Sequence, residues 1–530
     1  MWLAVLGRLE SPAGTWGPVL MQVVSGGLAL LQLGLWLLLL AASVQLLKLA
    51  RWAMFAAAGA GPIEPESRAV DAAGSVGAVA PIVTVQLPMR NERFVARRAI
   101  AAACALDWPA ERLQIQVLDD SDDDTVAVVD AAAQEFCRLG HDVAVVRRGE
   151  RTSYKAGHLD YALPGARGEF IAILDADFVP PADFLRRLVP ALARDPQLAF
   201  VQGRWAFLNE DKNLLTRVQA LILYGLMLVE QAYLSAHGRP VQFNGSGGIW
   251  RKSVLVAAGG FVGHGGPGGA AAASVTEDLD LSYRVHLCGY RSRHMPEVAV
   301  PTELPESMAA FRSQQQRWVR GGAQVLGSLL AKLRGGTLSA GERLTMLGHL
   351  LRHARQPYLL LSLLWLPVLA LGLCPAAYSP PGGLQGGVLL LHAALFLYYG
   401  AALRRAGRSP LWALGLAPLV VGLSMGLSVS LTVALWRGIV GGRAAEFVRT
   451  PKTGGVSPSR TDAASDAAPP RLYRPVRDAL ARFEVVLGLA YAVLAAVALG
   501  RGQVMAALGL GALVATGLLW VGLGSLRSAP

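Results

Sequence analysis

Three short acidic motifs occur in order along the chain, and a motif of glutamine, arginine and tryptophan follows them. They are Asp119-Asp120, Asp175-Ala176-Asp177 and Glu277-Asp278, followed by Gln314, Arg317 and Trp318. Paired carboxylates can bind a divalent cation or remove a proton, and arginine can neutralise a diphosphate. The series therefore predicts chemistry on a metal-bound diphosphate, with a carboxylate acting as general base.

Transfer of a sugar from a nucleotide diphosphate would need such a set of groups. The spacing of Asp175 and Asp177 points both carboxylates toward a loop, and their hard oxygens suit Mg²⁺ or Mn²⁺, with Asp177 as the main ligand. Asp119 and Asp120 end an apolar strand and can accept hydrogen bonds from the ribose or base. An isolated Asp-x-Asp pair is also typical of solvated loop acids, so the prediction of a metal site rests on the whole ordered series of motifs.

The remaining tasks also have candidates. Lys155 supplies a point charge for phosphate, although a lone lysine is also typical of a protein surface. Asp278, with Glu277 beside it, is a candidate general base or, alternatively, an N-terminal capping acid of a helix. Gln314, Arg317 and Trp318 have helical spacing and share one face. That spacing lets Arg317 neutralise the leaving diphosphate while Trp318 offers a platform for a sugar ring.

Alternating strands and helices must position these groups. Apolar, β-branched runs predict strands at 82–87, 113–118, 143–146, 170–174 and 198–202, separated by helical spacing at 94–106, 125–139 and 181–193. Such alternation predicts a mostly parallel sheet covered by helices. The acidic motifs follow strands, where open α/β sheets place their ligand crevice. The neighbouring acids 122–124 are predicted to form a solvated turn and helix start.

The bulk composition predicts a membrane protein. The chain has 530 residues, 53% of them hydrophobic and 16% charged, with a formal net charge of +12. Many Lys and Arg residues flank apolar segments, as the positive-inside rule expects, and no nucleic-acid motif is present, which argues against nucleic-acid binding. The four cysteines are widely spaced, which argues against both a disulfide framework and a zinc site.

Hydropathy divides the chain into segments. The predicted parts are a transmembrane helix in 1–50, a linker at 51–80, a cytosolic catalytic domain at 81–324, amphipathic interface helices at 325–356, a transmembrane hairpin with a re-entrant or in-plane segment at 357–436, a cytosolic loop at 437–480 and two transmembrane helices in 481–530. A conventional span is the alternative for 410–436. Lys48 and Arg51, which follow the first helix, place the catalytic domain in the cytosol.

Eight strings in order resemble inverting family-2 glycosyltransferases of the cellulose-synthase superfamily, above all the cellulose-synthase-like mannan and glucan synthases and their bacterial relatives. The strings are VQLPMRNE, QVLDDSDD, YKAGHLDYAL, ILDADF, VQGRW, FNGSGGIWRK, TEDLDLSYR and QQQRW. The resemblance covers roughly 240 residues. It implies a GT-A (Rossmann-like) α/β domain embedded in an α-helical membrane domain, a UDP-glucose or GDP-mannose donor and a growing glycan as acceptor. It also implies nucleotide-sugar contacts from Pro88, Asn91, Glu92, Asp119, Asp120, Lys155, Asp175 and Arg317, and acceptor contacts from Gln314, Trp318 and Trp205.

A further motif lies beyond the catalytic domain. Residues 446–452 resemble the gating loop of cellulose synthases, with Phe447, Thr450 and Lys452 at matching positions and Arg449 departing from the pattern. The alternative is a basic juxtamembrane loop attracted to anionic lipid. A second departure is a Gly/Ala-rich insertion at 259–274, just before the predicted base.

We therefore expect a processive, inverting glycan synthase in a bacterial inner (plasma) membrane, which makes a β-1,4-linked glucan or mannan and couples its growth to export through an unknown partner. Membrane lipids surround it. One alternative is a single transfer to a lipid acceptor such as ceramide or diacylglycerol. Another is a noncatalytic transporter or scaffold with a decayed transferase domain. The presence of every acid expected for catalysis argues against the last.

Overall fold

The computed structural model describes residues 34, 37, 39–56, 80–263, 276–330, 332–334, 338–370, 383–440 and 479–527. The motif residues Phe447, Thr450 and Lys452 and most of the Gly/Ala-rich insertion lie outside these ranges.

A seven-stranded mixed sheet forms the centre of the catalytic domain, in the order β3-β2-β1-β4-β6-β5-β7. The strands are β1 (Val83–Met89), β2 (Leu113–Asp119), β3 (Asp142–Val146), β4 (Phe170–Ile173), β5 (Leu198–Phe207), β6 (Gly248–Arg251) and β7 (Arg291–Thr302). Neighbouring strands are parallel except that β6 runs antiparallel to both β4 and β5. The predicted α/β class with a mostly parallel sheet is confirmed.

Helices cover the sheet because the connections between parallel strands must cross its faces. They are α4 (Ala96–Cys104), α5 (Thr125–Arg138), α6 (Tyr154–Ala162), α7 (Phe184–Arg194), α10 (Lys252–Ala257) and α11 (Glu277–Leu287). The central strands are buried on both faces. Val83 and Val85 of β1 and Ile115 of β2 pack on one face with Ile100 and Phe184 from the covering helices, and buried polar residues such as Thr84 and Gln86 of β1 lie on the other. This core fixes the carboxyl ends of β1, β2 and β4 side by side.

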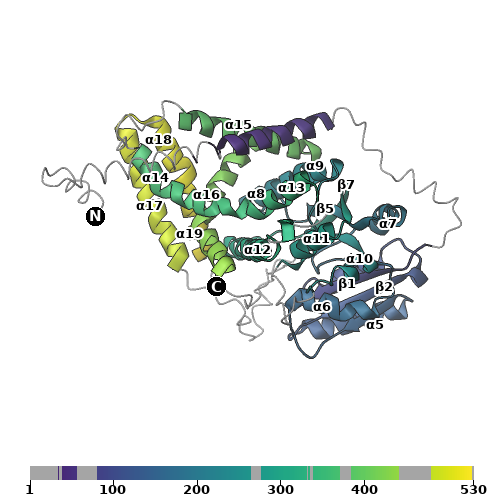
Figure 1. Cartoon of the computed structure of the whole chain (residues 1–530). Coiled ribbons are helices and arrows are strands. Elements are labelled where there is room, and N and C mark those ends of the chain that lie inside the picture. The colour runs from purple at the N-terminus through teal and green to yellow at the C-terminus, as the bar shows by residue number, and fades with distance from the viewer. Residues whose placement is uncertain are drawn as a thin grey trace.

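Long apolar helices stand on one side of the sheet domain (Figure 1). They are α14 (Arg355–Ala370), α15 (Gly383–Arg405), α16 (Trp412–Val440), α17 (Ala479–Gly500), α18 (Val504–Leu508) with the π-helix Gly509–Ala515, and α19 (Thr516–Arg527). Among the described residues, six helices are long and apolar enough to cross a membrane, including the first, Leu39–Ala56. The chain is therefore a multi-pass membrane protein.

One of those six helices belongs to the catalytic domain. It spans Leu214–Ala236, built from α8 (Leu214–Tyr224), the π-helix Gly225–Gln231 and α9 (Ala232–Ala236), and 67% of its apolar window is buried. It begins at a capping box made by Asn213 and Thr216 and packs in one apolar cluster with Leu49, Tyr398 and Ala417. The sequence prediction did not include this helix, which joins the sheet domain to the helices beside it.

Segment 410–436 is predicted to be broken and re-entrant or in-plane, but from residue 412 onward it lies in one continuous helix, α16, with Pro418 inside it. Its orientation relative to a membrane stays a prediction. In the predicted interface region, α13 (Ala340–Leu350) buries Met346 and Leu350 against Tyr283 and Leu329. Leu344, on the same helix, is 71% exposed. Part of its apolar face is therefore covered by protein rather than available to lipid.

Candidate active site

The carboxyl ends of β1, β2 and β4 bring the first two acidic motifs to one edge of the sheet. The backbone N–H of Asp120 donates to Met89 O at 3.0 Å, and the backbone N–H of Asp175 donates to Ser246 Oγ at 2.8 Å. Pro88 lies within β1, opposite Leu118 of β2. This is the crevice edge that the strand pattern predicts.

A lysine and three acids meet just beyond β4. Lys155 Nζ lies 2.6 Å from Asp175 Oδ1 and 2.9 Å from the carbonyl oxygen of Gly245. Gly245 has a φ of +82° and stands so close to Asp278 that a Cβ there would lie 3.1 Å from Asp278 Oδ2. The same Cβ would lie 3.9 Å from Lys155 Nζ, so Gly245 is close to both the lysine and Asp278. Lys155, Asp175, Glu277 and Asp278 therefore form one cluster, which we call the acid–lysine cluster.

Burial and crowding of like charges set the protonation of this cluster. Burial, together with the charge of Glu277, raises the pKa of Asp278 to about 7 even though Lys155 opposes the shift. Burial also raises the pKa of Glu277, against the positive charges of Lys155 and Arg317. Although burial alone would lower it, the pKa of Lys155 is raised by Asp175, Glu277 and Asp278. A carboxyl whose pKa lies near neutrality suits a general base.

Activity should follow this titration. Asp278 accepts a proton only when it is ionised, so kcat/KM for sugar transfer should rise with pH, by about tenfold per pH unit below 7, and level off above it. Initial rates of the purified chain between pH 5 and 9 measure the profile. A rate that is flat across this range, or that falls as pH rises through 7, contradicts the assignment.

Asp278 is not the capping residue that its sequence position also allowed. Helix α11 has Thr276 as its N-cap, without a side-chain cap hydrogen bond, and Asp278 is the second residue of the helix. Its Oδ1 accepts from the backbone N–H of Leu279 at 2.9 Å. Because Oδ1 is held by the backbone, Oδ2 is the oxygen that faces Gly245.

Asp177 lies deeper than Asp175. It is 6% exposed, and its Oδ2 accepts a hydrogen bond from Thr302 Oγ1 at 2.9 Å. Among the described residues, no group of three or more His, Cys, Asp or Glu side chains is arranged to hold a metal ion. Mg²⁺ commonly takes only one or two carboxylates from the protein and completes its shell with substrate phosphates and water. Two acids at one strand end fit such a shared site.

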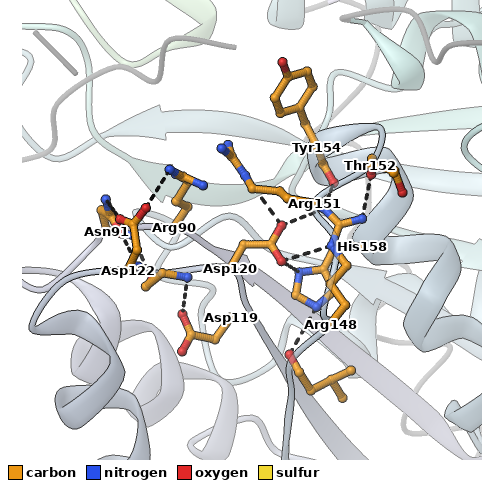
Figure 2. A network of polar contacts seen from close by, with 12 residues as sticks. Arg90, Asn91, Asp119, Asp120, Asp122, Arg148, Arg151, Thr152, Tyr154 and His158 are labelled. Carbon is orange, nitrogen blue, oxygen red and sulfur yellow. Dashed lines mark hydrogen bonds and ion pairs between the residues drawn. The ribbon is translucent and has the colours of Figure 1, made fainter. Parts of the chain in front are cut away.

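A second polar network surrounds Asp120 (Figure 2). Arg148 Nε and Nη2 donate to the two carboxylate oxygens of Asp120 at 3.0 and 2.6 Å, and His158 Nδ1 lies 3.0 Å from Oδ1. Burial alone would raise the pKa of Asp120, but the hydrogen bonds from His158 and Arg148 lower it to about 2. Asp120 is therefore ionised and held rigidly. Neither Arg148 nor His158 was predicted from the sequence as a partner of Asp120. The signal for Arg148 was the basic pair Arg147-Arg148 directly after the predicted strand at 143–146.

Arg148 also shapes the loop that carries Lys155. It donates to the carbonyl oxygens of Thr152 and Tyr154, each at 2.6 Å. Ser153 and Tyr154 both have left-handed φ values, 54° and 48°, which are uncommon for residues other than glycine. The buried guanidinium thus holds a strained bend that places Lys155 in the first turn of α6.

The other predicted nucleotide residues support the same edge. Asn91 and Asp122 bind each other through the Asn91 amide and the backbone N–H of Asp122, at 2.7 and 3.0 Å, and Arg90 pairs with Asp122. Asp119 is 2% exposed and pairs with Arg147, while Glu92 is buried and its carbonyl oxygen accepts from the start of the next helix. Asp122 therefore links two loops in addition to forming the predicted turn.

The Gln-Arg-Trp motif lies on α12 (Met308–Leu329), where Gln314, Arg317 and Trp318 are all half-buried. One turn later, a Cβ on Gly321 would lie 2.4 Å from Thr276, the residue before Glu277. The helix that carries Arg317 therefore contacts the start of the helix that carries the predicted base. Trp205 belongs to the same region, since its indole N–H donates to Ser246 O at 3.1 Å.

The predicted residues thus fall into two neighbouring groups. The acid–lysine cluster contacts Gly245, and the charge of Arg317 acts on its Glu277. Asp120 belongs to the network around Arg148, while Asp119 pairs with Arg147 and Asn91 with Asp122. Ser246, which joins Asp175 to Trp205, carried no predicted role although the string FNGSGG contains it. The roles assigned to all these residues stay predictions.

Comparison with known proteins identifies the domain. Residues 80–321 match the family model described as glycosyltransferase like family 2. This segment is a family 2 glycosyltransferase domain. The resemblance predicted from the sequence strings and the GT-A class that it implies are confirmed by this match and by the observed sheet.

The family 2 domain also has named relatives. Glucomannan 4-beta-mannosyltransferase 2 of Arabidopsis thaliana is 40% identical over 257 residues, which cover 48% of this chain and 46% of the relative. Probable glucomannan 4-beta-mannosyltransferase 3 of Oryza sativa subsp. japonica is 39% identical over 265 residues, with the same shares. The chain thus spans about half the length of the curated relatives it matches. A solved mannosyltransferase from Pyrobaculum calidifontis, in complex with GDP-Man and Mn²⁺, aligns at TM-score 0.44 and 22% identity over 74% of this chain and 99% of that one.

Proposed function

We propose that the chain is an inverting membrane glycosyltransferase that extends a β-1,4-linked mannan or glucomannan processively from GDP-mannose. The observation that carries the proposal is the acid–lysine cluster, which lies in a domain 40% identical to a named glucomannan 4-beta-mannosyltransferase. UDP-glucose is the second donor, as a mixed glucomannan would require. The products expected from this chemistry are a longer glycan and a nucleoside diphosphate.

The residues perform a single displacement. The acceptor hydroxyl oxygen attacks the anomeric carbon of the donor from the side opposite the diphosphate, so that the new C–O bond forms as the bond to the phosphate oxygen breaks. The hydroxyl proton passes to Asp278 at Oδ2, since Oδ1 already accepts from Leu279. Lys155 and Arg317 neutralise the charge that develops on the leaving diphosphate. Configuration at the anomeric carbon is inverted.

Asp177 and Asp175 would hold a divalent cation, Mg²⁺ or Mn²⁺, which when bound neutralises charge on the diphosphate. Thr302 orients Asp177 for this role, and Lys155 neutralises Asp175 until the donor arrives. The network of Asp120, Arg148 and His158 keeps Lys155 in place. Asn91, Glu92 and Pro88 support the edge that receives the nucleotide.

The acceptor side consists of aromatic and amide groups. Trp318 and Trp205 offer rings on which a sugar can stack, and Gln314 offers hydrogen bonds to hydroxyl groups. We place the catalytic domain on the cytosolic side of the membrane, on the basic residues that flank the apolar helices. Export of the product depends on the predicted gating residues Phe447, Thr450 and Lys452.

Product analysis tests the proposal. The full chain, purified in lipid nanodiscs, is incubated with labelled GDP-mannose or UDP-glucose, each with and without Mn²⁺, and the products are separated by size. We expect a metal-dependent polymer from GDP-mannose that a β-mannanase degrades. A labelled single-sugar lipid would instead support the lipid-acceptor alternative. Failure to consume either donor in the presence of metal would contradict both readings.

A further inference from the structure

Helix α12 carries Arg317 on one face and contacts the membrane helices with another. Gln314, Arg317 and Gly321 follow one another at helical spacing, and Gly321 contacts Thr276 beside the predicted base. Met308, Arg312 and Ala323 lie on the other side and are buried. Figure 1 places α12 between the sheet domain and the helices α16 and α19. A helix fixed on its membrane side therefore has its catalytic side fixed as well.

A charge pair is buried at this joint. Arg312 Nη1 lies 3.2 Å from Glu484 Oε2 on α17, and their side chains are 7% and 0% exposed. The same Nη1 donates to Ser525 Oγ on α19 at 3.3 Å. Arg312 thus connects α12 to two helices that follow it by more than 160 residues. An ion pair in such surroundings tolerates little change in geometry, because losing one partner leaves a buried charge uncompensated.

Close backbone packing limits movement of α12 further. A Cβ on Gly438 of α16 would lie 2.7 Å from Arg320 O and 2.8 Å from Ala323 Cβ. A Cβ on Gly524 of α19 would lie 2.9 Å from Met308 Cβ. The helix therefore has almost no clearance on its membrane side. A rotation that moved Arg312 would move Arg317, because both belong to one rigid helix.

We propose that Arg312 and Glu484 are positioning residues whose ion pair fixes the rotation of α12 and so holds Arg317 beside Glu277. The membrane helices thereby set the geometry of the diphosphate site in addition to anchoring the domain. This inference rests on the proposed function insofar as Arg317 binds the diphosphate of the donor.

A double-mutant cycle tests the coupling. Binding of GDP with Mn²⁺ to the full chain in nanodiscs is measured by calorimetry for the unchanged chain, Glu484→Gln, Arg317→Ala and the double variant. We expect Glu484→Gln to raise the Kd for GDP about tenfold when Arg317 is present, but less than twofold in the Arg317→Ala background. Equal factors in the two backgrounds, or no weakening in either, overturn the proposal, since a general loss of stability would act on both.

Further variants separate positioning from folding. The exchanged pair Arg312→Glu with Glu484→Arg should restore GDP affinity to within about threefold of the unchanged chain. Arg312→Lys keeps the positive charge but loses the planar guanidinium, so it should weaken GDP binding less than Glu484→Gln does. Failure of the exchanged pair to restore affinity counts against the proposal. Glu210→Gln is the matched control: Glu210 is buried and forms its ion pair with Arg408 rather than with a residue of α12, and its change should leave GDP affinity unaltered.

A readout without nucleotide distinguishes the two proposals. If the unchanged chain binds neither GDP nor UDP, the proposed function fails, and hydrogen exchange along α12 still tests the ion pair. Glu484→Gln should speed exchange of peptides covering 314–321, and the exchanged pair should slow it again. Exchange that stays the same in Glu484→Gln overturns the positioning role.

Discussion

Replacing Asp278 with Asn is expected to lower kcat for sugar transfer by about 10²–10⁴-fold. Asn fills the same space but accepts no proton at neutral pH, so the acceptor hydroxyl would attack without a base. The donor should bind nearly as before, because proton transfer stabilises the transition state and not the bound substrate. The rise of activity with pH should vanish together with the group that titrates at about 7.

Rates and donor KM of the purified variant, measured from pH 5 to 9, check this expectation. Asp280→Asn is the matched control, since Asp280 lies two residues away and pairs with Arg284 at 2.7 Å instead of joining the acid–lysine cluster. It should retain transfer within about threefold, because its mostly buried ion pair with Arg284 includes no residue of the acid–lysine cluster. Full activity in Asp278→Asn would remove this residue from the chemistry and leave Glu277 as the acid to examine.

Replacing Lys155 with Met should lower kcat/KM by about 10²–10³-fold, the usual cost of losing one group that stabilises transition-state charge. Two effects combine. The developing charge on the diphosphate loses a partner, and Asp175 loses the ammonium that lies 2.6 Å from it. Because Lys155 acts to lower the pKa of Asp278, its removal should also move the rising part of the pH profile toward higher pH.

The shift of the pH profile distinguishes an effect of Lys155 on the pKa of Asp278 from phosphate binding alone. Lys252→Met serves as the control: Lys252 also sits at the start of a helix and donates to a backbone carbonyl, that of Ala166, but lies outside the cluster. A profile that moves to lower pH, or activity equal to that of the unchanged chain, would contradict the arrangement of charges described for Lys155.

The first five strands could be predicted from the sequence because each is a short apolar run between polar turns. The run at 113–118 became β2, Leu113–Asp119, and the run at 143–146 became β3, Asp142–Val146. Strands β6 and β7 were not predicted. β6 has four residues between glycine-rich and helical segments, and β7 is an edge strand with arginines and two prolines, which shows no apolar alternation.

The candidate site also has a part that the sequence predicts and a part that it does not. Its acids are found by sequence because each follows a strand or starts a helix, as Asp120 and Asp278 do. The partners of those acids come from distant segments: Arg148 binds Asp120 across 28 residues, and Arg312 pairs with Glu484 across 172. No local pattern marks such pairs, because only the packing of the folded chain brings them together.

The buried helix Leu214–Ala236 has a consequence for work with isolated fragments. It lies within the sequence of the family 2 domain, yet its apolar surface is covered by α15 and α16 from beyond that domain. Cutting the chain after residue 321 would strip this cover and leave a hydrophobic patch facing water, which favours aggregation. Detergent or a lipid bilayer would then have to take the place of the missing helices, even for a fragment that contains the whole sheet.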